Sequence, residues 1–254
     1  MNTICKLADI DIYLLYYLDI KTIMLLTIVS INQNILLTNL DFVKELKKLK
    51  IELNGSTHIS MQNIILLAAC RNYISIIRWV HESIHKFIYD ISTIVFAASK
   101  GHIDILEWFA KSPYEFKYSV WAINWASENC HINILDWFAK SGYEFKYTSD
   151  AIDNASRRGY LQVLEWFAKS QYEFKYTEQA INQASKNGYI DILDWFDKSV
   201  YKFKYTVNAL VWASKKGMIL VLEWFNNSKY EFKNVEFAIS EAKRTDRQNV
   251  LDGY

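Results

Sequence analysis

The 254-residue sequence contains a single proline and only seven glycines. An all-β sandwich or barrel needs many tight turns built from these residues, so we expect a mainly helical protein. Cysteine is scarce as well, with only Cys5, Cys70 and Cys130, each isolated in the sequence. This odd set has no CxxC spacing, which argues against a disulfide framework or zinc motif and is typical of a reducing compartment.

A strong charge excess and a long apolar segment are also absent. The 29 basic and 28 acidic residues give a formal net charge of +1, whereas domains that bind nucleic acid are usually basic. The most apolar stretch, residues 10–31, is interrupted by Asp19 and Lys21, and neither half reaches the ~20 residues that span a bilayer. No secretion signal is recognisable. We therefore expect a cytoplasmic protein whose partner is neither nucleic acid nor a membrane.

What the sequence does contain is a repeat of 29 residues. Tryptophan, alanine and leucine each recur at this spacing. The columns are Trp79, Trp108, Trp137, Trp166, Trp195 and Trp224; Ala68, Ala97, Ala126, Ala155, Ala184, Ala213 and Ala242; and Leu106, Leu135, Leu164, Leu193 and Leu222. A fixed period of 20–50 residues is the signature of a solenoid, in which stacked neighbours bury the apolar faces that one repeat cannot bury alone.

One repeat, residues 148–176, predicts two short helices and a linker. Thr148 is placed to cap a first helix, and Gly159 suits the left-handed residue that ends it. Leu164 belongs to the apolar face of a second helix, which should end near Ser170. The pentapeptide YEFKY then leads to the next repeat, with its aromatic side chains turned toward neighbouring repeats. We expect little true sheet from it.

Charged residues follow the same period. Acid and base stand four residues apart on the second helix, as on exposed helical surface; these pairs are Glu107–Lys111, Asp136–Lys140, Glu165–Lys169 and Asp194–Lys198. The linkers carry a column of lysines, namely Lys117, Lys146, Lys175, Lys204 and Lys233. We expect a solvated edge that the neighbouring glutamates neutralise, with docking of an acidic partner as the alternative.

The segment GHIDILEWFAKS (101–112) resembles the second helix of an ankyrin repeat. Ile105 and Leu106 stand for the family's paired valines, and Trp108 and Phe109 for its paired leucines. The family's T-P-L-H tetrapeptide is replaced by forms such as WAIN and DAID. The period is also shorter than the usual ~33 residues. Such shortened repeats are similar to those in the ankyrin families of giant DNA viruses of amoebae.

This resemblance implies an all-α solenoid of stacked helix–turn–helix repeats joined by short extended linkers. The array should cover residues 61–254, as about six repeats and a C-terminal capping helix near 235–245. It implies a monomeric, non-enzymatic scaffold for a partner protein and, for a viral protein, the cytoplasm of the host cell.

Residues 1–60 do not carry the repeat. Within residues 7–32 the apolar spacing resembles an F-box, and the matching positions include Leu7, Ile12, Leu15, Leu18 and Leu26. That resemblance implies docking to the Skp-type adaptor of a cullin–RING ubiquitin ligase, which would make the chain a substrate receptor. The alternative is that these residues form helices that cap the first repeat. Both interpretations remain open.

The motif HESIH (81–85) matches the H-E-x-x-H pattern of zinc proteases. In the repeat register the helix should end at Ser83, between the two histidines, which breaks the geometry that a metal needs. His102 and His131 stand in the column after the helix-ending residue, where hydrogen bonding within the loop is expected. No phosphate loop and no catalytic triad is recognisable. We therefore predict no catalytic or metal-binding residue, no cofactor and no enzymatic activity.

In a solenoid the recurring positions build the stack, and the varying positions are free to bind. Two first-helix columns vary in this way. They hold Trp121, Asp150, Gln179 and Asn208, and Trp125, Asn154, Gln183 and Trp212. Trp121 and Trp125 share one face of a helix, and binding energy concentrates in such aromatic side chains. We predict that a partner docks here, on the concave face of an ankyrin array; gap filling between repeats is the alternative role of these tryptophans.

Overall fold

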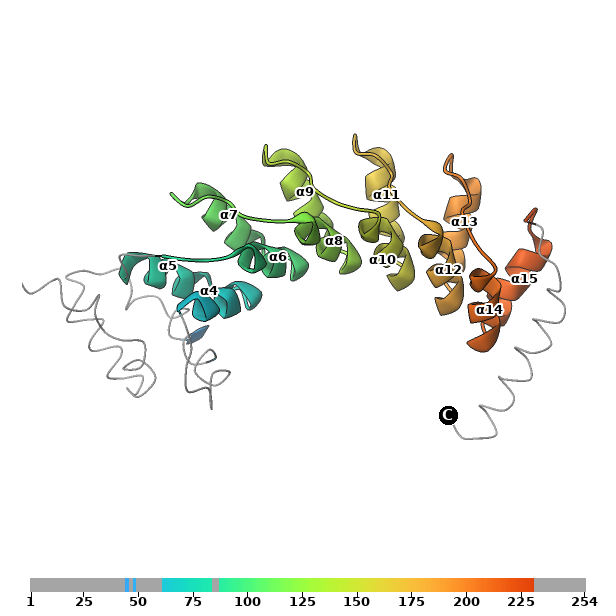
Figure 1. The fold of residues 1–254 in the computed structure, drawn as a ribbon, viewed down its shortest axis with the longest axis horizontal. Coiled ribbons are helices and arrows are strands. Elements are labelled where there is room, and N and C mark those ends of the chain that lie inside the picture. The colour runs from blue at the N-terminus through green and yellow to red at the C-terminus, as the bar shows by residue number, and fades with distance from the viewer. Residues whose placement is uncertain (1–43, 46–47, 49–60, 84–86, 231–254) are drawn as a thin grey trace, which may run out of the picture. The chain divides into compact units, whose positions relative to one another are not determined.

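The computed structural model describes residues 44, 45, 48, 61–83 and 87–230. These residues form helices and no strands, so the predicted all-α class is confirmed. The chain divides into two units, Met1–Ser119 and Val120–Tyr254. In each unit the described residues form helical hairpins joined by extended linkers, as in a helical repeat solenoid (Figure 1).

The N-terminal unit contains two described hairpins. Their helices are α4 (Met61–Cys70) and α5 (Ile74–Ser83), then α6 (Ile91–Ser99) and α7 (Ile103–Lys111). Helix α5 ends at Ser83, as the repeat register predicts. His85 lies outside the described residues, and His81 packs edge-on against Phe87 and Trp108 while its Nδ1 lies 2.6 Å from the Tyr114 hydroxyl.

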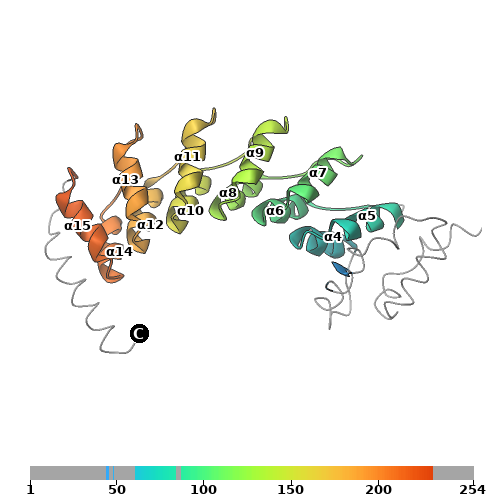
Figure 2. The same ribbon diagram turned by 180° about the vertical axis from the view of Figure 1, so that it is seen from behind.

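The described part of the C-terminal unit, residues 120–230, contains four hairpins in sequence. Its helices are α8 (Val120–Glu128), α9 (Ile132–Lys140), α10 (Asp150–Arg158), α11 (Leu161–Lys169), α12 (Glu178–Asn187), α13 (Ile190–Lys198), α14 (Asn208–Lys215) and α15 (Ile219–Asn227). The first helices α8, α10, α12 and α14 pack in one row, and the second helices α9, α11, α13 and α15 lie along it in another (Figures 1 and 2).

The repeated apolar columns form the core between the rows. Every described member of the alanine column is fully buried, and so are the leucines from Leu106 to Leu222. Alanine has no bulk beyond its Cβ, so neighbouring first helices can approach closely. The phenylalanines of the second helices complete the core; they are Phe109, Phe138, Phe167, Phe196 and Phe225, each at most 1% exposed.

The helix ends follow from two recurring devices. Gly159 and Gly188 end α10 and α12 with φ angles of 76° and 82°, in the left-handed region that suits glycine. A serine follows each second helix from α7 to α15, and its hydroxyl donates to the carbonyl three residues before, at 2.7–3.0 Å. It also accepts from the backbone amide of the tyrosine two residues later, at 3.2–3.4 Å. These bonds turn the chain from the second helix into the linker.

A buried polar side chain in the first helix holds the start of the next repeat. The Nδ2 of Asn124 donates to Thr148 Oγ1 at 2.8 Å, and the Thr148 amide donates back to Asn124 Oδ1 at 3.1 Å. Asn182 makes the same pair of bonds with Thr206, at 2.8 and 3.0 Å. Both asparagines are fully buried, so these bonds also satisfy polar atoms that water cannot reach. We call this arrangement the threonine clamp.

In the repeat between these two, the clamp residue is Asp153, so a carboxylate takes the place of the asparagine amide. Asp153 accepts from the Thr177 amide at 2.9 Å and from its hydroxyl at 2.7 Å. Burial raises the pKa of Asp153, and the hydrogen bonds from Thr177 only partly oppose that rise. Thr177 Oγ1 in turn accepts from the Gln179 amide at 3.1 Å and caps α12. The threonine therefore joins the clamp to the start of the next helix.

The linkers fill the spaces between repeats with aromatic rings. Phe145 stacks on Tyr172, with ring centroids 3.9 Å apart, and on Trp166 at 5.5 Å. The same three positions are stacked in the next two repeats. The hydroxyl of Tyr147 donates to the Glu173 carbonyl, and burial raises its pKa to about 12, so it stays a protonated donor. As predicted, the aromatic side chains turn toward neighbouring repeats while Glu144 is exposed.

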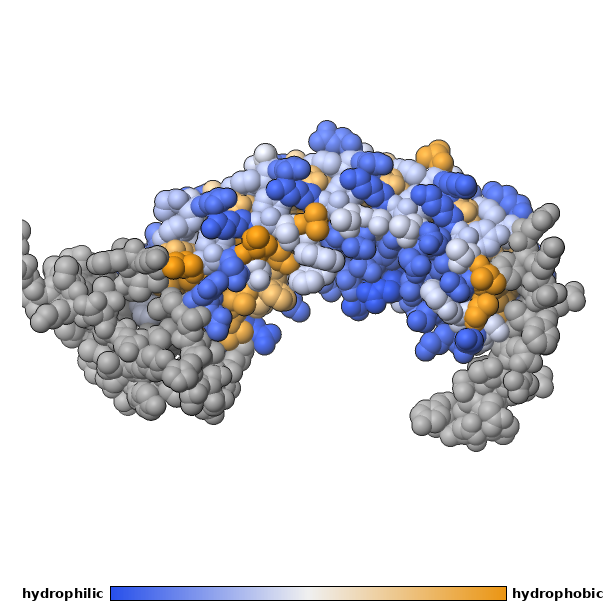
Figure 3. Space-filling model, in the orientation of Figure 1, coloured by the Kyte–Doolittle hydropathy of each residue, from blue (hydrophilic) through white to orange (hydrophobic). Residues whose placement is uncertain are grey.

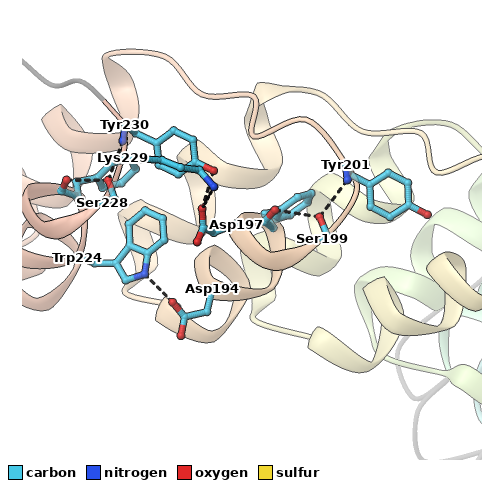
Figure 4. Close-up of polar contacts among 10 residues, drawn as sticks. Asp194, Asp197, Ser199, Tyr201, Trp224, Ser228, Lys229 and Tyr230 are labelled. Atoms are coloured by element: carbon cyan, nitrogen blue, oxygen red, sulfur yellow. Dashed lines mark hydrogen bonds and ion pairs between the residues drawn. The ribbon is translucent and has the colours of Figure 1, made fainter.

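Polar contacts between second helices add to this interface (Figure 4). The indole Nε1 of Trp224 donates to Asp194 at 2.6 Å, as Trp166 does to Asp136 at 2.7 Å. At the α13–α15 interface Asp197 also accepts from the Tyr230 hydroxyl at 2.9 Å and pairs with Lys229 at 2.8 Å. The expected helix-surface pairs form at Glu107–Lys111, Glu165–Lys169 and Asp194–Lys198. The acidic column thus has a second role that its spacing to lysine did not reveal.

The buried charge of the middle clamp gives the first prediction. Asp153→Asn should raise the free energy of unfolding at pH 7 by about 1 kcal/mol, because it removes a desolvated charge and keeps the bonds to threonine. A raised folded-state pKa means that the ionised group costs stability above that pKa and that protonation relieves the cost as the pH falls. The gain should therefore shrink on acidification, which urea unfolding at several pH values measures.

Asn182→Asp is the matched reverse variant, since it places the charge in the equivalent fully buried position. It should lose stability at pH 7 and recover part of it at acidic pH. A stability for Asp153→Asn that is equal to or below that of the parent protein at pH 7 would contradict this account of the clamp.

The left-handed residue that follows each first helix gives the second prediction. After α8 this residue is Cys130, with a φ of 59°, a conformation that a side chain disfavours. Cys130→Gly should stabilise the protein by about 0.5–1 kcal/mol. The variant relieves backbone strain in the folded state, and the greater conformational freedom of glycine in the unfolded chain offsets part of that gain. Gly159→Cys should destabilise it, because a Cβ there would lie 2.8 Å from the Tyr189 ring. In thermal unfolding, Cys130→Gly should raise the unfolding temperature and Gly159→Cys should lower it. Shifts in the same direction would refute the claim that this position needs a left-handed residue.

Candidate functional site

The sequence-predicted partner positions all lie on the first helices of the C-terminal unit. We call their solvent-facing side, on α8, α10, α12 and α14, the outer face. Trp121 is 44% exposed, although its repeat equivalents are Asp150, Gln179 and Asn208. The rings of Trp121 and the half-buried Trp125 lie 5.7 Å apart, so the two side chains form one aromatic surface on α8.

The middle of the outer face is polar and uncharged apart from Asp150. Asp150 accepts from the Thr148 hydroxyl at 3.0 Å and so belongs partly to the capping of α10. The half-buried side chains of Asn154 and Gln183 make no hydrogen bond within the described part of the chain. Their amide groups are therefore available as donors and acceptors for another molecule. In Figure 3 the surface over α10 and α12 is predominantly hydrophilic.

On α14 the outer face regains an aromatic residue. Trp212 is half-buried, and the Nζ of Lys186 lies 5.6 Å from its ring centroid. Val211 is 37% exposed beside it, in the column where the earlier repeats carry the clamp residue. Figure 3 shows a small hydrophobic area over α14. Aromatic surface thus occurs on the first and last of the four helices, with amide groups between them.

Sequence reasoning missed a basic border to this face. Cations gather at the C-terminal ends of α10, α12 and α14; we call them the basic edge, which consists of Arg157, Arg158, Lys186, Lys215 and Lys216. Both arginines reach Glu128 on α8, at 2.7 and 3.2 Å. The sequence does show this pattern, since Arg157, Lys186 and Lys215 stand 29 residues apart. It was not singled out, because cations are common at the C-terminal ends of helices in general.

In three repeats the lysine of the linker is neutralised by a neighbouring glutamate. Lys117, Lys146 and Lys175 each pair with the glutamate two residues before, at 3.8, 3.4 and 3.9 Å. Lys204 has Lys202 in place of that glutamate, and its Nζ donates instead to the Tyr176 carbonyl at 3.1 Å. It also lies 4.1 Å from the Tyr176 ring centroid. These contacts favour the interpretation of a solvated edge, and Lys233 lies outside the described residues.

Two further sequence positions have structural partners. The ring Nε2 of His102 donates to the Cys70 carbonyl at 3.1 Å, and burial lowers the pKa of that histidine. The half-buried thiol of Cys130 lies 3.9 Å from Gln162 Oε1, and burial raises its pKa. Among the described residues no group of three or more His, Cys, Asp or Glu is arranged to hold a metal ion.

The F-box-like positions Leu7, Ile12, Leu15, Leu18 and Leu26 lie outside the described residues, so adaptor docking stays a prediction. Of residues 1–60 the structure describes Lys44, Glu45 and Lys48, and the Glu45 carboxylate accepts from the Ser75 and Ile76 amides at 3.1 and 3.3 Å. Within the described ranges no helix has the length and apolarity that crossing a membrane requires. No protein-family model matches the chain, and no curated protein matches it.

Proposed function

We propose that this protein is a non-enzymatic scaffold that holds a partner protein on the outer face of its C-terminal unit. The observation that carries the proposal is the exposed tryptophan pair on α8. Trp121 is 44% exposed at a position where the other three repeats carry polar side chains. Stacking of the repeats therefore does not need it, and exposed aromatic residues are common anchors of protein interfaces.

The other aromatic columns support the proposal by contrast. Trp166 and Trp224 stack on linker rings and donate hydrogen bonds to the preceding repeat, so they serve the stack. The second helices and linkers use their aromatic residues in the same way. The outer face differs, because its tryptophans vary between repeats and Asn154 and Gln183 keep amide groups without an intramolecular bond in the described chain.

We further propose that the repeats are shortened ankyrin-type units. The left-handed turn after each first helix, the apolar second helix and the extended linker are features that such units share. A period of 29 residues leaves the linker without a hairpin, which fits the extended backbone of the pentapeptide. The host-cell cytoplasm expected for a viral protein of this type is part of the same proposal.

Substitution of the tryptophan pair tests the function. Trp121→Ala with Trp125→Ala should weaken capture of the partner more than 30-fold, because hot-spot aromatics contribute about 2 kcal/mol or more each. Affinity capture from an amoebal lysate, followed by quantitative mass spectrometry, measures the loss. Circular dichroism of the variant should remain helical, since both side chains lie outside the fully buried core.

Trp166→Ala is the matched control, because it removes a tryptophan that serves the stack. It should lower the unfolding temperature and leave binding by the folded fraction unchanged. If the pair variant captures the same proteins in the same amounts as the parent chain, the proposed binding face is wrong.

A further inference from the structure

We propose that the segment bound on the outer face is an extended acidic stretch of the partner protein, with its carboxylates on the basic edge. This inference rests on the proposed scaffold function and specifies the chemistry of the partner. The C-terminal ends of α10, α12 and α14 carry five cations, of which two share the carboxylate of Glu128 on α8, in a chain whose formal net charge is only +1.

The basic edge runs along the C-terminal ends of α10, α12 and α14, and polar contacts join neighbouring helices along it. Arg157 and Arg158 bridge from α10 to Glu128 on α8. The side-chain amide of Asn187 donates to the Arg157 carbonyl at 2.8 Å and so joins α12 to α10. Lys186 lies over the ring of Trp212 and joins α12 to α14. These contacts place the cations along one border of one surface, close enough for a single segment to meet several of them.

Cations on the second helices provide an internal comparison. Lys111, Lys169 and Lys198 also lie in last turns, and each pairs with the acid four residues before it. On the first helices that preceding position holds Asn154 before Arg158, Asn182 before Lys186 and Val211 before Lys215. At these three positions the first helices lack the acid that pairs with each of those lysines on the second helices; Arg158 shares Glu128 on α8 with Arg157 instead.

The helix dipole does not account for this edge by itself. One cation in the last turn satisfies the preference of a helix C-terminus, yet α10 ends in two arginines, and α14 ends at Lys215 with Lys216 directly after it. Both lysines, Lys215 and Lys216, are exposed and make no ion pair within the described ranges. Asp153, one turn before Arg157, is buried and engaged by Thr177, so it does not compensate the arginine.

The rest of the outer face suits a peptide that lies across the helices. Asn154 and Gln183 stand one turn before the basic edge, where their amides can pair with the backbone of an extended chain. Packed helices lie 8–10 Å apart, so three steps from α8 to α14 span about 27 Å. An extended chain rises about 3.3 Å per residue, which corresponds to a segment of about eight or nine residues. Aromatic anchors stand at both ends, at Trp121 and Trp212.

Nucleic acid also presents a row of negative charges, but the face favours a peptide. The cations border only one side of the face, and the remainder is aromatic or amide surface. A strand of nucleic acid would be expected to follow a groove lined by cations along its length. We therefore commit to an acidic peptide segment and include nucleic acid in the test.

The test begins with selection of random dodecapeptides displayed on phage, with the full chain as bait. Selected peptides should be enriched in Asp and Glu together with apolar residues. The best peptide, labelled with fluorescein, should bind more weakly as the salt concentration rises. The variant Arg158→Gln, Lys215→Gln, Lys216→Gln should bind it roughly tenfold more weakly.

The matched control is Lys140→Gln, Lys169→Gln, Lys198→Gln, which removes the same charge from exposed ends of second helices. It should bind the peptide as the parent chain does. Equal losses in the two triple variants would overturn the inference, because the effect would then follow net charge rather than the basic edge. Tighter binding of a 20-nucleotide single strand than of the peptide, lost in the first variant, would overturn it as well.

The outcomes separate this inference from the function on which it rests. If neutral or apolar peptides are selected, and they depend on Trp121 and Trp125 but not on the basic edge, the scaffold stands and the acidic segment is refuted. If no class of peptide binds in a way that depends on either the tryptophans or the basic edge, both proposals are refuted.

Discussion

The stacking of α8, α10, α12 and α14 depends on the threonine clamp, in which a polar side chain buried in one first helix binds the start of the next repeat. Asn124, Asp153 and Asn182 are at most 7% exposed, so each must find partners inside the protein. They find them on the backbone and the hydroxyl of a threonine 24 residues later. A linker one residue shorter or longer would misplace that threonine. The clamp therefore constrains the period of the repeat as well as its stability.

Around this constraint, each row of helices uses its side chains differently. The second helices and linkers direct aromatic rings into the spaces between repeats, where Phe145 and its equivalents stack on a tryptophan and a tyrosine. Polar bonds such as Trp224 to Asp194 tie the same row together. The first helices bury alanine, isoleucine and the clamp residue on their inner side. Their outer face does not serve the stack, and its aromatic, amide and basic residues are the chemistry that we assign to binding.

Much of the fold could be predicted from periodicity, because recurring apolar residues mark what is buried. The left-handed turn at Gly159, the helix end at Ser170 and the extended linkers all follow from local sequence. The clamp could not be predicted in this way, since Asn124 and Asp153 are polar residues whose burial depends on a partner 24 residues away. The basic edge was missed for a similar reason: its significance depends on how the helices pack, because one carboxylate, Glu128, is shared by Arg157 and Arg158, and Lys215 and Lys216 have no ion pair within the described residues.

A double-mutant cycle between Asn124 and Thr148 tests the central claim most directly. The sequence itself contains an apolar form of this pair, since the equivalent positions 211 and 235 are both valine. Asn124→Val and Thr148→Val should each destabilise the protein, because each leaves a polar group without its partner. The double variant should cost less than the sum of the two, with a coupling energy of about 1 kcal/mol or more in urea unfolding. Additive losses, within about 0.3–0.5 kcal/mol, would contradict the claim that this clamp holds one repeat to the next.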